Sequence, residues 1–138
     1  METYLALLRG INVGGKNIIK MVDLKSCFET MGFSDVITYI QSGNIIFKTS
    51  EGNKHLLTQQ IEKGLSERFN YPSKIVLISY NQYGYIIKHA PKDFGEYKEI
   101  YKYDVVFLKE SLTPKEAIQY ITLREGVDKI YEGLYTLY

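Results

Sequence analysis

The sequence predicts an α+β fold, namely a ferredoxin-like βαββαβ unit followed by a second, truncated unit of similar order. Three observations predict it. Short apolar runs and two helical stripes follow one another in the βαββαβ order over residues 1–79. Another helix, a strand, a helix and two short β runs occupy 80–138. Finally, 138 residues with 45% apolar and 24% charged side chains suit one compact body.

The first unit has clear signals for each element. We expect strands at residues 3–8, 35–41, 44–49 and 74–79, with a hairpin joining the second and third. Helical spacing predicts one helix from the stripe Met21, Leu24, Phe28 and Met31, ending at Gly32. It predicts a second helix from the stripe Leu57, Ile61, Leu65 and Phe69.

The second unit should cover the open face of the first. Strands 3–8 and 74–79 are apolar on both sides, and a sheet buried on both faces needs a second cover. Residues 81–89 indicate a helix and residues 103–108 a strand. Thr113, Pro114 and Glu116 form the N-cap, first-turn proline and capping box of another helix. The runs 128–133 and 134–138 are short β candidates, so we expect the second unit to pack on the first as one body.

The stretch RGINVGGKN, residues 9–17, raises the question of a phosphate-binding loop. It satisfies the P-loop pattern after a strand, but Asn17 stands where a Ser or Thr should bind Mg²⁺, and the next helix starts late. An anion nest without a metal remains a hypothesis, because glycines can take positive φ and expose successive amides. Its residues would be Arg9, Asn12, Gly14, Gly15, Lys16, Asn17 and Lys20. The alternative is a glycine-rich turn with solvated cations.

The hairpin turn offers a second group of polar side chains. Gln41, Ser42 and Asn44 could contact a polar ligand, although Gly43 and Asn44 are also residues that a tight turn prefers. In a ferredoxin-like sheet we expect strands one and three to be parallel, which puts this turn at the end of the sheet opposite the glycine loop. One site could then contain both only if the loop, whose eleven or so residues reach about 35 Å, folds back across the sheet.

The remaining composition argues against several functions. The chain has one cysteine, Cys27, and two histidines, His55 and His89, that lie far apart in the sequence. This spacing is not that of metal ligands, and it offers no cysteine–histidine pair. We therefore expect no metal and no cofactor, and a buried structural thiol. The formal charge of +1 lacks the footprint of a strong duplex-DNA binder, so a nucleic-acid role would need a local basic patch. No signal peptide or membrane span can be recognised, which predicts a cytoplasmic protein away from membranes.

Thirteen tyrosines are an unusual number for this length, and most follow residue 80. Exposed aromatic side chains stack bases in RNA-binding sheets. No motif of that kind accompanies them here, and tyrosine also buries a large area while keeping a polar tip. The sequence favours core and interface packing.

A longer match concerns the segments ALLRGINVGGKN, MVDLKSCFETMGF and TYIQSGN. Together they resemble the signature region of the bacterial family called domain of unknown function 1697, strongly over the first fifty or so residues and more weakly beyond. The resemblance implies an α+β, ferredoxin-like, duplicated fold and no particular reaction. Family members usually continue with a further helix and a strand, whereas this sequence stops at Tyr138. We therefore expect an uncovered apolar edge at 134–138 and a homodimer through the C-terminal half.

Three functional hypotheses follow. The first is a small binding module that recognises an anionic small molecule or a phosphate-bearing partner through residues 9–17. The second is an enzyme acting on a phosphorylated metabolite or nucleotide, with Arg9 and Lys16 stabilising charge and no base identified. The third is a protein-interaction or structural module in which the loop only shapes the fold.

Overall fold

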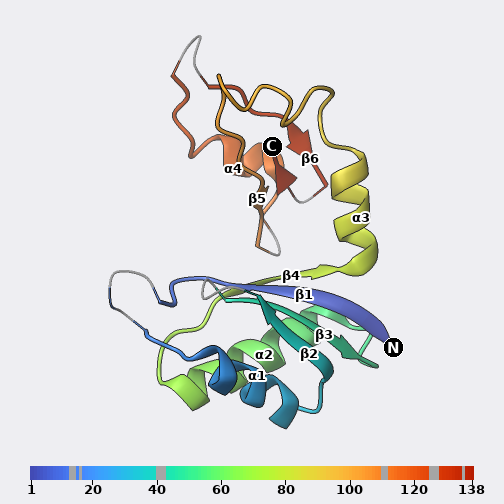
Figure 1. Cartoon of the computed structure of the whole chain (residues 1–138), viewed down its shortest axis with the longest axis vertical. Helices are drawn as coiled ribbons and strands as arrows, with labels where there is room; N and C mark the ends of the chain where they lie inside the picture. Colours follow the sequence, from blue (N-terminus) through green and yellow to red (C-terminus); the bar gives the residue numbers. More distant parts are fainter. Residues whose placement is uncertain (13–14, 16, 40–42, 110–111, 125–127, 135) are drawn as a thin grey trace. The chain divides into compact units, whose positions relative to one another are not determined.

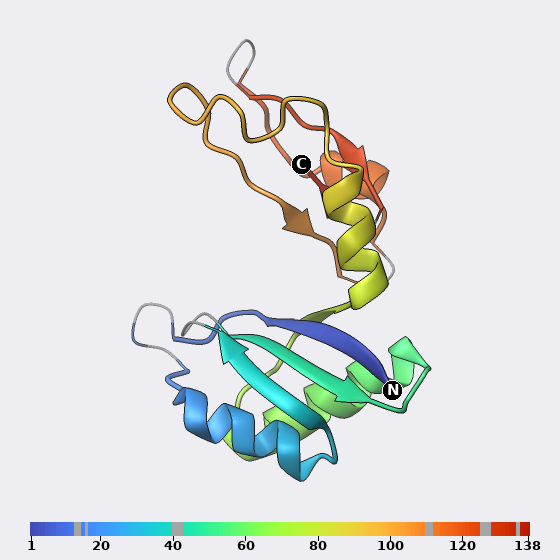
Figure 2. The ribbon, with the colours of Figure 1, turned by 45° about the vertical axis from the view of Figure 1, so that its right-hand side comes forward.

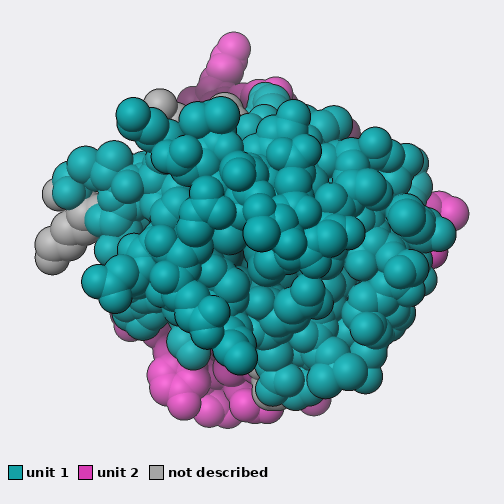
Figure 3. All heavy atoms as spheres, turned by 90° about the horizontal axis from the view of Figure 1, so that it is seen from below, with its two compact units in different colours: residues 1–80 teal, residues 81–138 magenta. Residues whose placement is uncertain are grey.

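The computed structural model describes residues 1–12, 15, 17–39, 43–109, 112–124, 128–134 and 136–138. The chain is an α+β protein with two compact units, Met1–Tyr80 and Asn81–Tyr138. Figure 3 colours the units separately, with unit 1 seen from the side of its helices. That the second unit packs on the first as one body stays a prediction.

Unit 1 has the predicted βαββαβ order. Its four strands form one antiparallel sheet in the order β2-β3-β1-β4, and both helices lie on the same side of that sheet (Figure 1). The elements are β1 (Glu2–Leu8), α1 (Met21–Thr30), β2 (Ser34–Tyr39), β3 (Asn44–Thr49), α2 (Lys54–Phe69) and β4 (Ile75–Ser79).

Local signals explain where the two helices of unit 1 begin and end. After α1, Gly32 takes a φ of +94°, and the Phe33 N–H donates to the Phe28 carbonyl at 3.4 Å, which confirms the predicted glycine stop. Asn53 caps α2 by accepting a hydrogen bond from the Leu56 N–H at 3.1 Å. Asn70 ends α2 in the left-handed conformation, with φ +53° and ψ +56°.

The core of unit 1 lies between the sheet and the two helices. Both predicted helical stripes face it, with Leu24, Phe28, Leu57, Ile61 and Leu65 fully buried and Met21, Met31 and Phe69 partly buried against them. The aromatic rings of Phe28, Phe33 and Phe47 meet at centroid distances of 4.6 to 5.9 Å.

The other face of this sheet is also apolar. It carries Leu5, Leu7 and Val76, which are half-buried, and Ile37 and Ile46, which are 57% and 38% exposed. The pattern agrees with strands that are apolar on both sides. The element that covers this face remains a matter of prediction.

The expected direction of strand three was wrong. β1 pairs with β3 in antiparallel register, with Leu7 opposite Asn44. The reason is topological, because the α1 crossover makes β2 run parallel to β1, and the β2–β3 hairpin then reverses β3. The hairpin turn and the glycine loop therefore lie at the same end of the sheet, where Figure 2 shows the arrowhead of β2 beside the end of β1.

The strands of unit 2 follow the same order as part of the first sheet. The elements of unit 2 are α3 (Tyr80–Lys88), which begins at the last residue of unit 1, and then β5 (Val106–Phe107), α4 (Pro114–Ile118), β6 (Glu132–Gly133) and β7 (Thr136–Leu137). Its sheet order, β5-β7-β6, and its antiparallel pairs match β1-β3-β2 of unit 1. The predicted strand–helix–strand–strand order is present, although β5 is shorter than expected because only two of its residues pair with β7.

Two details of unit 2 bear on the sequence predictions. Thr113 caps α4 as expected, accepting from the Glu116 N–H at 3.2 Å while its hydroxyl donates to the Glu116 carboxylate at 3.0 Å. β7 is the middle strand, so the predicted exposed edge at the end of the chain is wrong. Leu137 and Tyr138 are buried, at 2% and 8% exposure.

A candidate anion-binding site at one end of the first sheet

Three segments of unit 1 meet where β1 ends. The Leu8 N–H donates to the Gly43 carbonyl at 3.0 Å, which ties β1 to the β2–β3 turn. The Arg9 N–H donates to the Lys74 carbonyl at 3.1 Å, which ties it to the start of β4. The backbone thus places Arg9 between the turn and Lys74, and the sheet itself positions the start of the glycine loop.

The described loop residues hold the loop together through their own amides. The Asn12 side chain accepts from the Ile19 N–H at 2.7 Å and donates to the Ile19 carbonyl at 3.1 Å. The Asn12 N–H donates to the Asn17 carbonyl at 3.1 Å, and the Asn17 side chain donates to the Gly10 carbonyl at 2.9 Å. These bonds bring residues 10, 12, 17 and 19 together and use both asparagines to build the loop.

Positive backbone φ angles recur along this loop. Gly10, Asn12, Gly15 and Asn17 have φ values of +76°, +53°, +74° and +50°. An anion nest forms where left-handed and right-handed residues alternate, so these left-handed residues are consistent with one. Asparagine is the non-glycine residue best suited to this conformation, so its placement is consistent with the backbone.

The turn packs tightly against the loop through Gly43. This residue has a φ of +85°, and a Cβ built on it would lie 2.7 Å from Ile11 Cδ1 and 3.0 Å from Leu8 Cβ. Ile11 itself is 1% exposed. The close approach therefore depends on glycine, and it places Gly43 in apolar contact with Ile11 and Leu8 where the loop starts.

The surface of this end carries three exposed cations, Arg9, Lys20 and Lys74. The ion pairs of Lys48 with Asp35 and of Arg124 with Asp128 involve none of these three cations. Two acids lie near them, namely Asp23 in the first turn of α1 and Glu62, whose carboxylate accepts from the Ile75 N–H at 3.0 Å, directly after Lys74. Three cations against these two carboxylates leave a positive balance at this end, which favours an anion.

The N-terminus of α1 begins beside the loop, directly after Lys20. Lys20 is its N-cap residue and makes no side-chain capping hydrogen bond. The backbone N–H groups of Asp23 and Leu24 both donate to the Lys20 carbonyl. A helix start without a side-chain cap leaves N–H groups and the positive end of the helix dipole available to an anion.

The predicted site residues fall into four groups. Arg9, Gly15 and Lys20 are exposed on the loop or next to it, and Asn12 and Asn17 serve the loop's internal hydrogen bonds. Asn44 is half-buried at the start of β3, opposite Leu7. Gly14, Lys16, Gln41 and Ser42 lie outside the described residues. Lys74 was missed, because nothing in a lone lysine before a strand signals that Arg9 will bond to its carbonyl.

Residues with potential for catalysis are scattered. Cys27 is buried in the core, as expected, and burial raises the pKa of its thiol, an effect that Arg68 only partly opposes. His89 stacks on Tyr85 with ring centroids 3.8 Å apart. The described residues contain no group of three or more His, Cys, Asp and Glu side chains that could hold a metal ion. Their helices are also too short or too polar to cross a membrane.

The tyrosines divide between core and surface. Tyr4, Tyr71 and Tyr138 are buried, as core packing predicts. Burial, and then a 2.8 Å hydrogen bond to the Glu2 carboxylate, raises the pKa of Tyr4 to about 12. Seven described tyrosines after residue 79 are between 39% and 84% exposed, so core packing does not explain most of that group.

The fold and the loop define a class of two-unit α+β protein with a glycine-rich loop after its first strand. The chain belongs to the family described as protein of unknown function (DUF1697), whose model matches residues 1–138. Among solved structures it is similar to the conserved bacterial protein SP0830 from Streptococcus pneumoniae, with a TM-score of 0.84 and 26% identity. That match covers 99% of this chain and 74% of the other. A comparison with curated proteins finds no match.

Proposed function

We propose that this protein is a small cytoplasmic binding module that holds an anionic, phosphate-bearing small molecule at the glycine-loop end of unit 1. The observation that carries the proposal is the antiparallel pairing of β1 with β3. It brings the loop, the β2–β3 turn and the start of β4 to one end of the sheet. Three exposed cations and the start of α1 gather there.

The described contacts suggest which residues shape the loop and which contact the ligand. Asn12, Asn17 and Gly43 set the loop shape, while Arg9 and Lys74 offer side chains that can reach an oxyanion. Arg9 can bind two oxygens through its planar guanidinium group, and Lys74 acts as a mobile point charge. A loop with this design binds phosphate without a metal, because backbone N–H groups and cations share the charge.

Calorimetric titration with pyrophosphate tests the proposal. Arg9→Gln and Lys74→Gln each remove one positive charge and keep a polar side chain of similar reach. Each should weaken binding by roughly tenfold to a hundredfold, the size of a lost charge-assisted hydrogen bond. Binding should also weaken as salt is added.

The control is Lys63→Gln, which alters an exposed lysine in the middle of α2. It should leave the affinity for pyrophosphate unchanged. Stability should change by less than about 0.5 kcal/mol in all three variants, since each residue is on the surface. Equal losses in the control and the site variants, or no binding by the wild-type protein, would reject the proposed function.

A further inference from the structure

A cavity of about 670 Å³ lies within unit 2. Its walls come from residues 91–104, from the segments on either side of 125–127, and from the end of the chain. Six aromatic side chains line it, namely Phe94, Tyr97, Tyr101, Tyr103, Tyr131 and Tyr138. Small-molecule sites are concave, mostly apolar and about this large. This cavity uses none of the residues of the anion site in unit 1.

Part of the aromatic wall is firmly held. Phe94 meets Tyr103 and Tyr138 edge-on, at centroid distances of 4.9 and 5.5 Å. The Tyr138 hydroxyl donates to the Ile86 carbonyl at 2.6 Å. A Cβ on Gly133 would lie 2.5 Å from the Tyr138 ring, so glycine makes room for that ring. These contacts form the wall before any ligand arrives, which lowers the entropic cost of binding.

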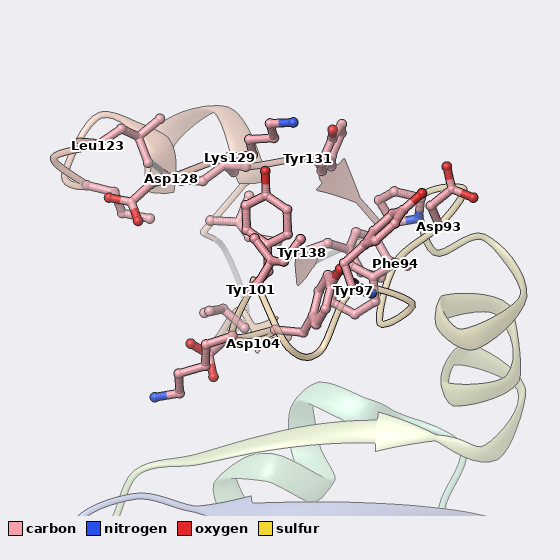
Figure 4. A pocket seen from close by; sticks show the side chains of 18 of the residues that line it. Asp93, Phe94, Tyr97, Tyr101, Asp104, Leu123, Asp128, Lys129, Tyr131 and Tyr138 are labelled. Atoms are coloured by element: carbon pink, nitrogen blue, oxygen red, sulfur yellow. Dashed lines mark hydrogen bonds between the residues drawn. The ribbon is translucent and has the colours of Figure 1, made fainter. Parts of the chain in front are cut away.

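Other rings of the cavity remain accessible. Tyr97, Tyr101 and Tyr131 are 49%, 39% and 48% exposed. Figure 4 shows the side chains of Phe94, Tyr97, Tyr101 and Tyr138 gathered around the cavity, with Lys129 above Tyr101 and Tyr138 in this view. Half-exposed tyrosine rings present flat apolar faces on which a planar ring can stack.

The charges around the cavity favour an anion beside that ring. Lys92, Lys102 and Lys129 line it together with Asp93, Asp104 and Asp128. Asp128 is ionised but already paired, because the Arg124 Nε and Nη2 donate to its two oxygens at 3.0 Å and hold the pKa of its carboxyl at about 2. Lys129 Nζ lies 5.7 Å from the centroid of the Tyr101 ring. A cation therefore stands next to an accessible stacking surface.

We propose that this cavity is a second binding site, for a planar aromatic ligand that carries a negative charge, of the chemical class of a mononucleotide. The ligand ring stacks on Tyr101 in place of the Lys129 ammonium, which lies over that ring in the free protein, and the displaced ammonium pairs with the anionic group. The hydroxyl groups of Tyr97 and Tyr131 supply polar contacts at the edge of the ring. Unit 2 thus selects for a flat ring, which unit 1 does not.

The test uses amide-shift NMR of the full chain with three probes, which are AMP, adenosine and inorganic phosphate. AMP should shift amides of the described residues 92–104 and 128–138 and bind more tightly than adenosine. Tyr101→Ala should weaken AMP and adenosine by roughly tenfold or more, because one stacking partner is lost. Lys129→Gln should weaken AMP and leave adenosine unchanged.

Matched controls come from the same unit. Tyr120→Ala removes a tyrosine that is 84% exposed, and Lys98→Gln removes an exposed lysine; neither side chain lines the cavity. Neither should change AMP affinity. If Tyr101→Ala unfolds unit 2, Val106→Trp offers a second variant that fills the cavity from β5 and should abolish AMP binding.

Two results would overturn the second site. One is an AMP titration that shifts only amides near residues 9–20 and 43–44, since AMP would then bind at the anion site through its phosphate. The other is an AMP affinity that neither Tyr101→Ala nor Val106→Trp reduces. The proposed function of unit 1 is tested separately. It fails if inorganic phosphate shifts no amides of unit 1, or if the Arg9 and Lys74 variants bind as tightly as the wild-type protein.

Discussion

Gly43→Ala would test how closely the hairpin turn packs on the glycine loop. The added Cβ would lie 2.7 Å from Ile11 Cδ1 and 3.0 Å from Leu8 Cβ, and Ile11 is buried at 1% exposure. Leu8 Cβ is fixed by the sheet, whereas Ile11 Cδ1 is the tip of a side chain that has to rotate within a closely packed site. The substitution therefore strains the contact between the turn and the loop.

The expected cost has two parts. Alanine at a φ of +85° should cost roughly 1–2 kcal/mol of backbone strain. Overpacking a buried contact should add about 1–3 kcal/mol. We therefore expect Gly43→Ala to lower the unfolding free energy of unit 1 by about 2–5 kcal/mol.

Gly10→Ala separates these two parts. Gly10 has a similar φ of +76°, but a Cβ there meets nothing within 4 Å. This variant should therefore lower the unfolding free energy only by the backbone strain, about 1–2 kcal/mol. Amide hydrogen exchange of the β1–β3 ladder reports on unit 1 specifically and measures both changes. Equal losses for Gly10→Ala and Gly43→Ala would show that the packing contact contributes nothing, and would refute the reasoning.

Four further predictions follow. Lys16→Ala should weaken phosphate binding by on the order of 1.5–3 kcal/mol while changing stability by less than ~0.5 kcal/mol. Gly15→Val should reduce both the phosphate affinity, measured by titration, and the stability, measured by urea unfolding. Because the pKa of Tyr4 is about 12 in the folded chain and near 10 when unfolded, the folded state holds its proton longer, and stability should fall from about pH 10 toward pH 12. Tyr4→Phe should reduce that fall, and parallel urea-midpoint profiles would contradict the assignment. Thr113→Ala should destabilise unit 2 by about 1 kcal/mol in hydrogen exchange, whereas Thr113→Ser should not. Sedimentation tests the homodimer that was expected through the C-terminal half. Because β7 is the middle strand, this expectation now rests on exposed apolar side chains such as Tyr120 and Leu123, and a monomer over a wide concentration range would reject it.

Helices were the part of the fold that sequence patterns predicted well. The stripes of α1 and α2 and the cap at Thr113 act locally, so spacing along the chain is enough to recognise them. The direction of β3 was missed because an apolar strand pattern shows which residues share a face but not which way the strand runs. Direction depends on the crossover through α1, which is a property of three elements together.

The candidate site shows a similar limit. Asn12 and Asn17 look like ligand-binding amides in the sequence, yet their side chains bond to Ile19 and Gly10 within the loop. A polar side chain can serve a ligand or the backbone, and spacing does not distinguish the two. Lys74 joins the site only through a backbone hydrogen bond from Arg9.

The cavity of unit 2 could not be predicted from the sequence either. Its tyrosines come from separate segments between residues 97 and 138, mostly outside regular elements, so no periodicity connects them. Their number signalled large aromatic surfaces, but whether those surfaces pack or remain open depends on how the loops fold.

Amide-shift NMR of the full chain titrated with inorganic phosphate tests the central claim most directly, because it locates an anion on individual backbone N–H groups. We predict that the shifted amides cluster at described residues between 9 and 20 and at Gly43 and Asn44, and that added salt reduces the shifts. The account would be contradicted if millimolar phosphate left those amides unchanged, or if the shifts were confined to unit 2.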